Sequence, residues 1–246
     1  MTELNFPQVD EPVLTALHQA VDYVLNRFDN IIGIIAAGSI LRGEGDANSD
    51  VDTFVIIEGD YRQRVQKFFN GVRFELFVNS VDFVPLYFEE EARDGGMSTA
   101  NMLVTGHVVL KRSPVVDDLI QQAQAALDAS PDYSEAMLIN HLYLLADRFE
   151  NGIDLRHRDP VMGLILVDAA LSGMLIYQFQ KQGKWIPRHK DLLKILRVEE
   201  PELANLVQQY YSTVGDKRFD IAGLIADYTL GVRGFFEWES DKDYLD

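Results

Sequence analysis

The sequence of 246 residues contains no cysteine. Disulfide bonds, thiolate nucleophiles and cysteine-based zinc sites are therefore excluded, and any metal must be held by oxygen or histidine ligands. The five histidines show no metal-ligand spacing such as His-x-x-x-His, so we expect them to be packing or surface residues. A Ser-His-Asp triad is also unsupported, because the chain has no Gly-x-Ser-x-Gly elbow.

Basic residues are scarce, with 22 Lys and Arg against 39 Asp and Glu and a net charge of −17. Broad binding to nucleic acid depends on Lys and Arg displacing counterions from phosphates, so we expect no nucleic-acid partner. A cationic small molecule would instead be attracted to such a chain. The simpler interpretation is that the acidity only keeps the protein soluble.

Long hydrophobic runs are also lacking, and we expect no segment of membrane-spanning length. Residues 1–7 do not combine a basic region with an apolar one, so no targeting segment is predicted. The hydrophobic fraction of 47% and the charged fraction of 25% are typical of a soluble globular protein. We therefore expect a cytoplasmic protein without a membrane partner, built as one large domain or two small ones.

The first half of the chain mixes helical and strand patterns. Apolar residues recur at helical spacing after Asp10-Glu11-Pro12, which has the composition of a helix start. Asn70-Gly71 separates two strand-like runs and predicts a two-residue hairpin turn. The expected helices are 11–29, 82–93 and 114–129, and the expected strands are 31–37, 51–57, 61–69, 72–78 and 108–111.

The second half shows only helical periodicity. Ser130-Pro131-Asp132 is the best candidate for a boundary, which divides the chain into residues 1–130 and 131–246. The expected helices are 134–151, 160–181, 189–197, 201–212 and 220–238. The fold class is therefore an α/β domain followed by an all-α helical bundle.

Most of the legible chemistry lies in residues 32–57. Gly38-Ser39 ends an apolar run, and Asp50 and Asp52 begin the next one. Side chains at positions i and i+2 of a strand share a face, so the two carboxylates are expected side by side. Two like charges held so close normally need a cation. The alternative is a polar turn before a buried strand.

Glu75 is a third carboxylate, placed within an otherwise apolar strand. It could instead face solvent or pair with an arginine on a neighbouring strand. Three converging carboxylates would form an all-oxygen site of the type that holds Mg²⁺ or Mn²⁺ with substrate phosphates. The backbone N–H groups of a glycine-rich turn and the Ser39 hydroxyl are suited to bind those phosphates.

Gly38-Ser39, ten intervening residues, Asp50-Val51-Asp52 and the later Phe74-Glu75-Leu76 together resemble the signature of the DNA polymerase β-like nucleotidyltransferase superfamily. Within it, the chain most resembles the small two-domain antibiotic nucleotidyltransferases, which modify aminoglycosides and lincosamides, and their uncharacterised relatives. The resemblance covers about the first half of the chain. The whole constellation is far more specific than any one part.

The resemblance implies a nucleotidyltransferase domain with a mixed sheet and flanking helices, followed by a bundle on the acceptor side. It implies that Asp50, Asp52 and Glu75 are the catalytic, metal-binding residues for Mg²⁺, as two ions, with Mn²⁺ as the alternative. The reaction would transfer a nucleoside monophosphate, AMP from ATP, to a hydroxyl of a small acceptor and release pyrophosphate. The implied nucleotide-binding residues are Gly38, Ser39, Arg42 and Ser49.

The second half offers fewer candidates. Residues 184–190, Lys-Trp-Ile-Pro-Arg-His-Lys, resemble a Trp-x-Pro-x-x-Lys turn of several such enzymes, which implies that Lys190 and Arg188 reach the triphosphate. A solvated basic turn is the alternative. Asp147 and Glu150 are candidates for a general base, although charged residues on a helix usually form a solvated face.

A second class of function is a regulatory, antitoxin-like binding module that keeps the fold with little or no turnover. The Arg and His spacing of a nuclease-type helical partner is absent from this sequence. An enzyme that modifies a protein or an RNA end is a third alternative, and the scarcity of basic residues disfavours RNA. The sequence leaves the acceptor, the nucleobase and the oligomeric state open, including a homodimer.

Overall fold

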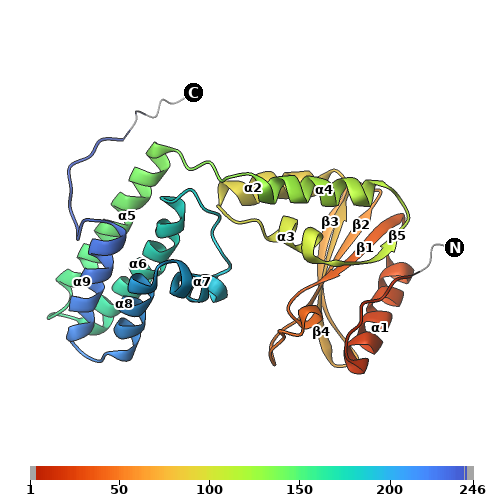
Figure 1. Ribbon diagram of the computed structural model, residues 1–246, viewed down its shortest axis with the longest axis horizontal. Helices are drawn as coiled ribbons and strands as arrows, with labels where there is room; N and C mark the ends of the chain where they lie inside the picture. The colour runs from red at the N-terminus through yellow and green to blue at the C-terminus, as the bar shows by residue number, and fades with distance from the viewer. Residues whose placement is uncertain (1–3, 241, 243–246) are drawn as a thin grey trace. The chain divides into compact units, whose positions relative to one another are not determined.

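The computed structural model describes residues 4–240 and residue 242. The chain divides into two compact units, Met1–Ala129 and Ser130–Asp246. The first unit contains strands and helices, whereas the regular elements described in the second unit are all helical (Figure 1). The predicted fold class, an α/β domain followed by a helical bundle, is confirmed.

A five-stranded mixed sheet with the order β3-β4-β2-β1-β5 forms the centre of the first unit. β2 and β4 pair in parallel, and the other neighbours pair antiparallel. β1 and β2 are almost entirely buried, which explains their near-continuous apolar sequences. The strands are β1 (Ile31–Ala37), β2 (Val51–Ile57), β3 (Arg62–Phe69), β4 (Val72–Ser80) and β5 (His107–Lys111).

The predicted hairpin joins β3 to β4. Asn70 and Gly71 have φ angles of 46° and 77°, the left-handed values that a tight two-residue hairpin turn requires at both central positions. Phe69 pairs with Val72 directly across this turn. The turn thereby fixes which residues of β4 share a face.

Helices cover both faces of the sheet. α1 (Glu11–Arg27) buries Leu17 and Val21 in the same core as Val55 and Leu76. On the other face, a methyl group at Gly33 would lie 2.7 Å from Val116, so α4 packs closely against β1 there. The remaining helices of this unit are α2 (Phe83–Arg93), α3 (Ser98–Thr105) and α4 (Val115–Asp128).

The sequence patterns did not predict α3. Its start is stabilised from α2, because the Glu91 carboxylate accepts hydrogen bonds from the Thr99 backbone N–H at 2.9 Å and from its hydroxyl at 2.7 Å. A carboxylate near a helix N-terminus is favourable. This partner lies eight residues away on another helix, so no local capping motif marks the start of α3.

The second unit is a helical bundle around one buried apolar core. Its two longest helices start with side-chain caps, since Ser134 accepts from the Met137 N–H and Asp159 accepts from the Met162 N–H. The helices are α5 (Glu135–Asp154), α6 (Pro160–Gln180), α7 (Leu192–Glu199), α8 (Pro201–Ser212) and α9 (Lys217–Thr229), with a 3-10 turn at His189–Asp191.

The last helix differs from the prediction of 220–238. α9 begins at Lys217 and ends at Thr229, where Gly231 adopts a left-handed φ of 72° and donates to the Ala226 carbonyl. Glycine in this conformation is a common helix end. Among the described residues after Thr229, none lies in a helix or strand. The aromatic residues at 235, 236 and 238 have a spacing that is also found in helices, so the predicted end of the last helix at residue 238 is wrong.

α6 also departs from the expectation that no segment reaches membrane-spanning length. It has 21 residues with a mean hydropathy of 1.8 in its most apolar window, so its length and composition alone would allow it to cross a membrane. A core helix of a globular protein passes the same test. Val167, Ala170, Leu171 and Met174 of α6 are indeed buried in the bundle core.

Candidate functional site

Strand pairing aligns the candidate acids of the first unit. Asp52 on β2 lies opposite Ala37 of β1 on one side and opposite Glu75 of β4 on the other. Residues directly across from each other share a face, and Asp50 shares that face because it precedes Asp52 by two positions. The sheet therefore places three carboxylates together, immediately beside the end of β1.

Oxygen atoms of Asp50, Asp52 and Glu75 all lie within 4.8 Å of one another, and each residue is half-buried. Ligand oxygens about 2.1 Å from one Mg²⁺ ion lie at most about 4.2 Å apart, so small side-chain rotations would suffice to share an ion. The donor set is hard and all-oxygen, which fits Mg²⁺ or Mn²⁺. These residues could therefore hold a divalent cation.

Gly38 turns the chain directly against this cluster. Its φ of 108° is unfavourable for residues with a side chain. A methyl group there would also lie 3.1 Å from the Asp50 carbonyl oxygen and 3.3 Å from Asp52 Oδ2. Glycine is thus required both by the backbone conformation and by the close approach of the acids.

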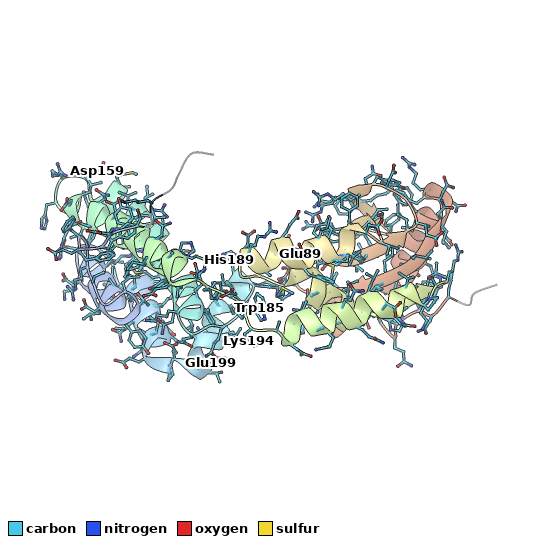
Figure 2. The ribbon with its side chains drawn as sticks, turned by 90° about the horizontal axis from the view of Figure 1, so that it is seen from above. Glu89, Asp159, Trp185, His189, Lys194 and Glu199 are labelled. Atoms are coloured by element: carbon cyan, nitrogen blue, oxygen red, sulfur yellow. The ribbon has the colours of Figure 1, made fainter. Side chains whose placement is uncertain are left out.

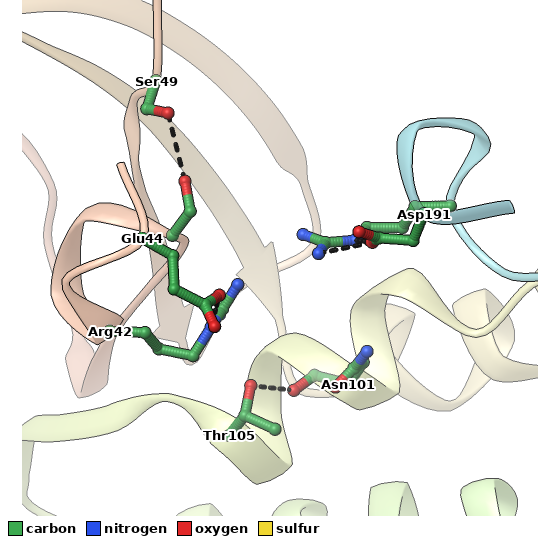
Figure 3. A network of polar contacts seen from close by, with 8 residues as sticks. Arg42, Glu44, Ser49, Asn101, Thr105 and Asp191 are labelled. Atoms are coloured by element: carbon green, nitrogen blue, oxygen red, sulfur yellow. Dashed lines mark hydrogen bonds and ion pairs between the residues drawn. The ribbon is translucent and has the colours of Figure 1, made fainter. Parts of the chain in front are cut away.

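The turn continues into a short 3-10 helix, Ile40–Arg42, preceded by Ser39. The Ser39 hydroxyl donates to the Ser49 hydroxyl at 3.1 Å, which ties the turn to the residue before Asp50 (Figure 3). Two of the predicted phosphate-side residues are therefore in direct contact. Their hydroxyls lie at the end of the sheet where the carboxylates gather.

The loop before Asp50 is held by its own polar groups and by β4. Ser49 accepts from the Asp46 N–H at 2.9 Å, and Asp46 accepts from the Asn48 N–H at 2.8 Å. Arg73, two residues before Glu75, donates to the Asn48 carbonyl at 3.3 Å and to its side-chain oxygen at 3.2 Å. Arg73 thus connects the strand of the third acid to the loop of the first.

Arg42, another predicted nucleotide-binding residue, forms an ion pair with Glu44 at 3.2 Å (Figure 3). The Arg42 side chain is 37% exposed and the Glu44 side chain is 60% exposed. An exposed pair of this kind contributes little to stability. The Arg42 guanidinium can therefore leave Glu44 for another partner at a small cost in free energy.

Glu75 has a second set of contacts. Arg64 of β3 approaches its Oε1 to 3.4 Å, and the Gln66 amide donates to the same oxygen at 3.4 Å. The Arg64 guanidinium also lies over the Phe77 ring at 4.5 Å. The alternative of an ion pair across neighbouring strands is thus present, and it coexists with the carboxylate cluster.

Arg64 and Arg73 were not among the predicted site residues. Both could have been found from the alternation of side chains along a strand. Arg73 lies two residues before Glu75 and shares its face. Arg64 lies two residues before Gln66, the residue that pairs with Glu75. The strand register needed for Arg64 depends on the hairpin turn. The pairing of β3 with β4 can be derived from the sequence only if Asn70-Gly71 is taken as a two-residue hairpin turn.

In the second unit, Arg188 and Lys190 lie in the exposed segment between α6 and α7. Arg188 forms an ion pair with Asp191 at 2.6 Å, and Lys190 lies within the 3-10 turn. Trp185 and His189 belong to the same segment, and His189 lies between Arg188 and Lys190 in the chain (Figure 2). The segment is basic and accessible, and its contact with a triphosphate stays a prediction.

Asp147 and Glu150 lie on α5 and line one cavity of about 580 Å³ in the second unit. Asp147 is exposed and accepts from the Asn151 amide at 3.1 Å. Glu150 accepts from the Phe235 N–H at 3.1 Å, so one of its oxygens already holds the backbone. The role of either residue as a general base stays a prediction.

Comparisons with known proteins agree with this geometry. Residues 17–101 match the family model described as "Nucleotidyltransferase domain". This range contains the Gly38-Ser39 turn and all three clustered acids. No curated protein matches the chain significantly.

A solved structure supports the fold. The nucleotidyltransferase-like protein from Exiguobacterium sibiricum 255-15 is 16% identical and superimposes with a TM-score of 0.51. The match covers 88% of this chain and 73% of that chain. At this identity the likeness concerns the fold alone.

The order of the motifs, the mixed sheet that gathers the acids, and the family match over residues 17–101 all point to one kind of domain. Transfer of a nucleotidyl group, which in this family typically uses divalent metal ions, is the general chemistry of that domain. Residues 17–101 of this chain are therefore similar to a nucleotidyltransferase domain, and that similarity supports nucleotidyl transfer in general.

Proposed function

We propose that this protein is a metal-dependent adenylyltransferase. It transfers AMP from ATP to a hydroxyl of a small, positively charged acceptor, such as an aminoglycoside-like molecule, and releases pyrophosphate. The observation that carries the proposal is the cluster of Asp50, Asp52 and Glu75 within 4.8 Å beside the Gly38-Ser39 turn. A net charge of −17 supports the choice of a cationic acceptor.

In this proposal, each group of the first unit has a defined task. The bound divalent cations, preferably two Mg²⁺ ions, would neutralise charge on the triphosphate and lower the pKa of the attacking hydroxyl. Asp50 and Asp52 would hold the cations, and Glu75 would complete the set of ligands. The backbone N–H groups after Gly38 and the hydroxyls of Ser39 and Ser49 bind the terminal phosphates.

Arginine and lysine side chains would orient the nucleotide. Arg42 can exchange its exposed ion pair with Glu44 for a phosphate oxygen, because that pair is weak in water. Lys190 and Arg188 are proposed to bind the triphosphate. Asp147 is the proposed general base for the acceptor hydroxyl.

The proposal is tested by pyrophosphate release from ATP, measured with Mg²⁺ and a panel of aminoglycosides. We expect Asp50→Asn and Asp52→Asn each to reduce release by about a thousandfold or more, because ligand loss removes several kcal/mol of charge stabilisation. Asp60→Asn, an exposed carboxylate in the turn after β2, is the matched control and should keep full activity. Equal turnover in all three variants contradicts the proposal.

A binding module with little or no turnover is the second candidate. It is favoured by one observation, the ion pair between Arg64 and Glu75, which partly neutralises the third acid. Such a module would gain thermal stability with ATP and Mg²⁺, as any ligand of the native state does, without releasing pyrophosphate. Thermal-shift and turnover measurements on the same samples separate the two functions.

A further inference from the structure

α6 is apolar on every side, yet the bundle covers only part of it. Asp168 is the one charged residue among the 21 residues of this helix. A helix that is apolar all round is normally enclosed by other protein. Only 33% of its most apolar window is buried, however, and Val161 and Ile165 are 69% and 55% exposed. One side of α6 therefore has no cover from the described residues of its own bundle.

The uncovered residues form a continuous stripe along the helix. They follow one another at intervals of three or four positions, the spacing that places side chains on one face. Four of them are exposed, the last is half-buried, and none carries a charge. At a rise of about 1.5 Å per residue, the stripe is about 22 Å long. The members of this α6 stripe are Val161, Ile165, Ala169, Ser172 and Ile176.

Charged residues of α5 and the turn that follows it border the α6 stripe. A hollow of about 380 Å³ beside Leu166 of α6 is lined by two arginines and two aspartates, Arg148, Arg158, Asp147 and Asp154. Within the part of the chain that the structure describes, neither arginine forms a hydrogen bond or an ion pair through its guanidinium. The rim of the stripe thus offers both signs of charge, and its positive groups are unpaired.

We propose that the α6 stripe binds the α6 stripe of a second copy of this chain, in a dimer with twofold symmetry. The same surface then lies on both sides, so the rim arginines of one copy can meet the rim aspartates of the other. An uncharged centre with a polar rim that contains arginine is the usual anatomy of a protein interface. The small side chains of Ala169 and Ser172, in the middle of the stripe, allow two helices to approach closely. This inference is independent of the proposed function.

The charges favour a second copy over a lipid surface as the cover of the stripe. The opposite face of α6 holds Val167, Ala170 and Met174 in the bundle core, so α6 could cross a membrane only if the bundle came apart. A net charge of −17 repels the protein from anionic lipids. The same charge opposes association of two copies through a face without cations, whereas this rim supplies Arg148 and Arg158.

Sedimentation equilibrium of the 246-residue chain over the micromolar range tests the proposal. We expect an equilibrium between monomer and dimer. Ile165→Glu should raise the dissociation constant about tenfold or more, because it places a charge in the uncharged centre of both copies. Val214→Glu is the matched control, since it adds the same charge at an 87% exposed valine between α8 and α9. It should leave the constant unchanged.

The absence of cysteine allows a second test, because an introduced thiol has no native competitor. Ala169→Cys places a thiol in the middle of the α6 stripe, and a short bismaleimide should join two copies of this variant covalently. Val214→Cys, treated in the same way, should remain a single chain.

Exchange of charges tests the rim. The double variant Arg148→Glu with Arg158→Glu should dimerise about tenfold more weakly, because its rim is then entirely acidic. Its mixture with the double variant Asp147→Arg and Asp154→Arg should recover the affinity, since the two rims are complementary again. Circular dichroism of each variant confirms that the bundle is folded.

Three results overturn the proposal. One is a wild-type chain that stays monomeric throughout the micromolar range. Another is a dimer that Ile165→Glu and Val214→Glu weaken equally, or that yields equal cross-linking of the two cysteine variants. The third is binding of the chain to phosphatidylcholine vesicles that Ile165→Glu abolishes, which would assign the stripe to lipid. No nucleotide is present in these measurements, so their failure leaves the proposed function untouched.

Discussion

Asp52 and Lys190 are both predicted from the sequence to act on a nucleotide, yet the protein holds them in different ways. Asp52 lies on a strand paired on both sides, opposite Ala37 and Glu75. Lys190 lies in an exposed 3-10 turn between two helices. Backbone pairing specifies the neighbours of a residue on a strand, whereas a residue in an exposed turn keeps a choice of partners. A change at Asp52 should accordingly alter the rate of the reaction, and a change at Lys190 should alter the affinity for the nucleotide.

Apart from loss of the acids themselves, the largest effect is expected from Gly38→Ala. The new methyl group meets Asp50 and Asp52, and displacement of reacting groups by about 1 Å can lower a rate about a hundredfold. Pyrophosphate release at saturating ATP measures this loss. Gly43→Ala is the matched control, because Gly43 has a φ of 71° but no atom within 4 Å of the position that the added methyl group would take. It should lose about 1 kcal/mol of stability from backbone strain and keep its activity.

A smaller effect is expected from Arg64→Met, which removes the guanidinium beside Glu75. Groups that orient a metal ligand typically contribute about ten- to a hundredfold to activity. We expect kcat to fall while KM for ATP changes little, and Arg64→Lys to restore part of kcat. Arg62→Met is the control on the same strand, since Arg62 lies over the Phe83 and Tyr87 rings. A higher kcat in Arg64→Met would instead favour the binding-module interpretation.

In the second unit, Lys190→Ala should raise KM for ATP about tenfold with little change in kcat, because one charge-assisted contact to phosphate is lost. Calorimetric titration of ATP with Mg²⁺ gives the affinity directly. Lys194→Ala changes an exposed lysine on α7 and serves as the control. Equal affinities in the wild type and Lys190→Ala would exclude Lys190 from the nucleotide site.

The smallest effect concerns two carboxylates with opposite pKa shifts. Burial raises the pKa of Glu91 above 4.5, despite its hydrogen bonds from Thr99. The folded state then binds the proton more tightly than the unfolded state, so this group makes the protein less stable as pH rises from 4.5 through the raised pKa. Glu91→Gln should therefore gain stability relative to the wild type as pH increases over that interval.

Glu200 of the second unit behaves in the opposite sense. Burial alone would raise its pKa, but hydrogen bonds from Gln178 and Gln182 and the nearby Lys181 outweigh burial and lower it. Its stabilising contribution is present above the unfolded pKa and is lost as pH falls through the lowered one. Thermal unfolding of Glu200→Gln and Glu91→Gln between pH 3 and 7 should give differences from the wild type that change in opposite directions.

Much of the fold could be predicted because local patterns and tertiary packing agree. Buried strands, a hairpin with Asn70-Gly71 and helices with Ser134 and Asp159 caps all follow from residue types at defined spacings. α3 could not be predicted, because its stabilising carboxylate comes from Glu91 on another helix. The end of α9 was misplaced because aromatic spacing outweighed the signal of Gly231.

Some features of the candidate site could likewise be predicted from the sequence, and others could not. The convergence of Asp50, Asp52 and Glu75 follows from the period of two and the pairing of strands, and the structure brings them together. Their catalytic roles stay predictions. The contact of Arg64 with Glu75 requires the register of two strands, and the cavity lined by Asp147 and Glu150 requires the path of a segment without regular structure. Neither can be obtained from residue spacing alone.

The parallel pairing of β2 with β4 has a consequence for how this site could be lost in evolution. Phe74 and Leu76 flank Glu75 in the chain and are both buried in the core under α1. A shift of β4 by one residue would bring both apolar side chains to the carboxylate face and expose that core. A molecule that completes its core in this register therefore also brings its three acids together.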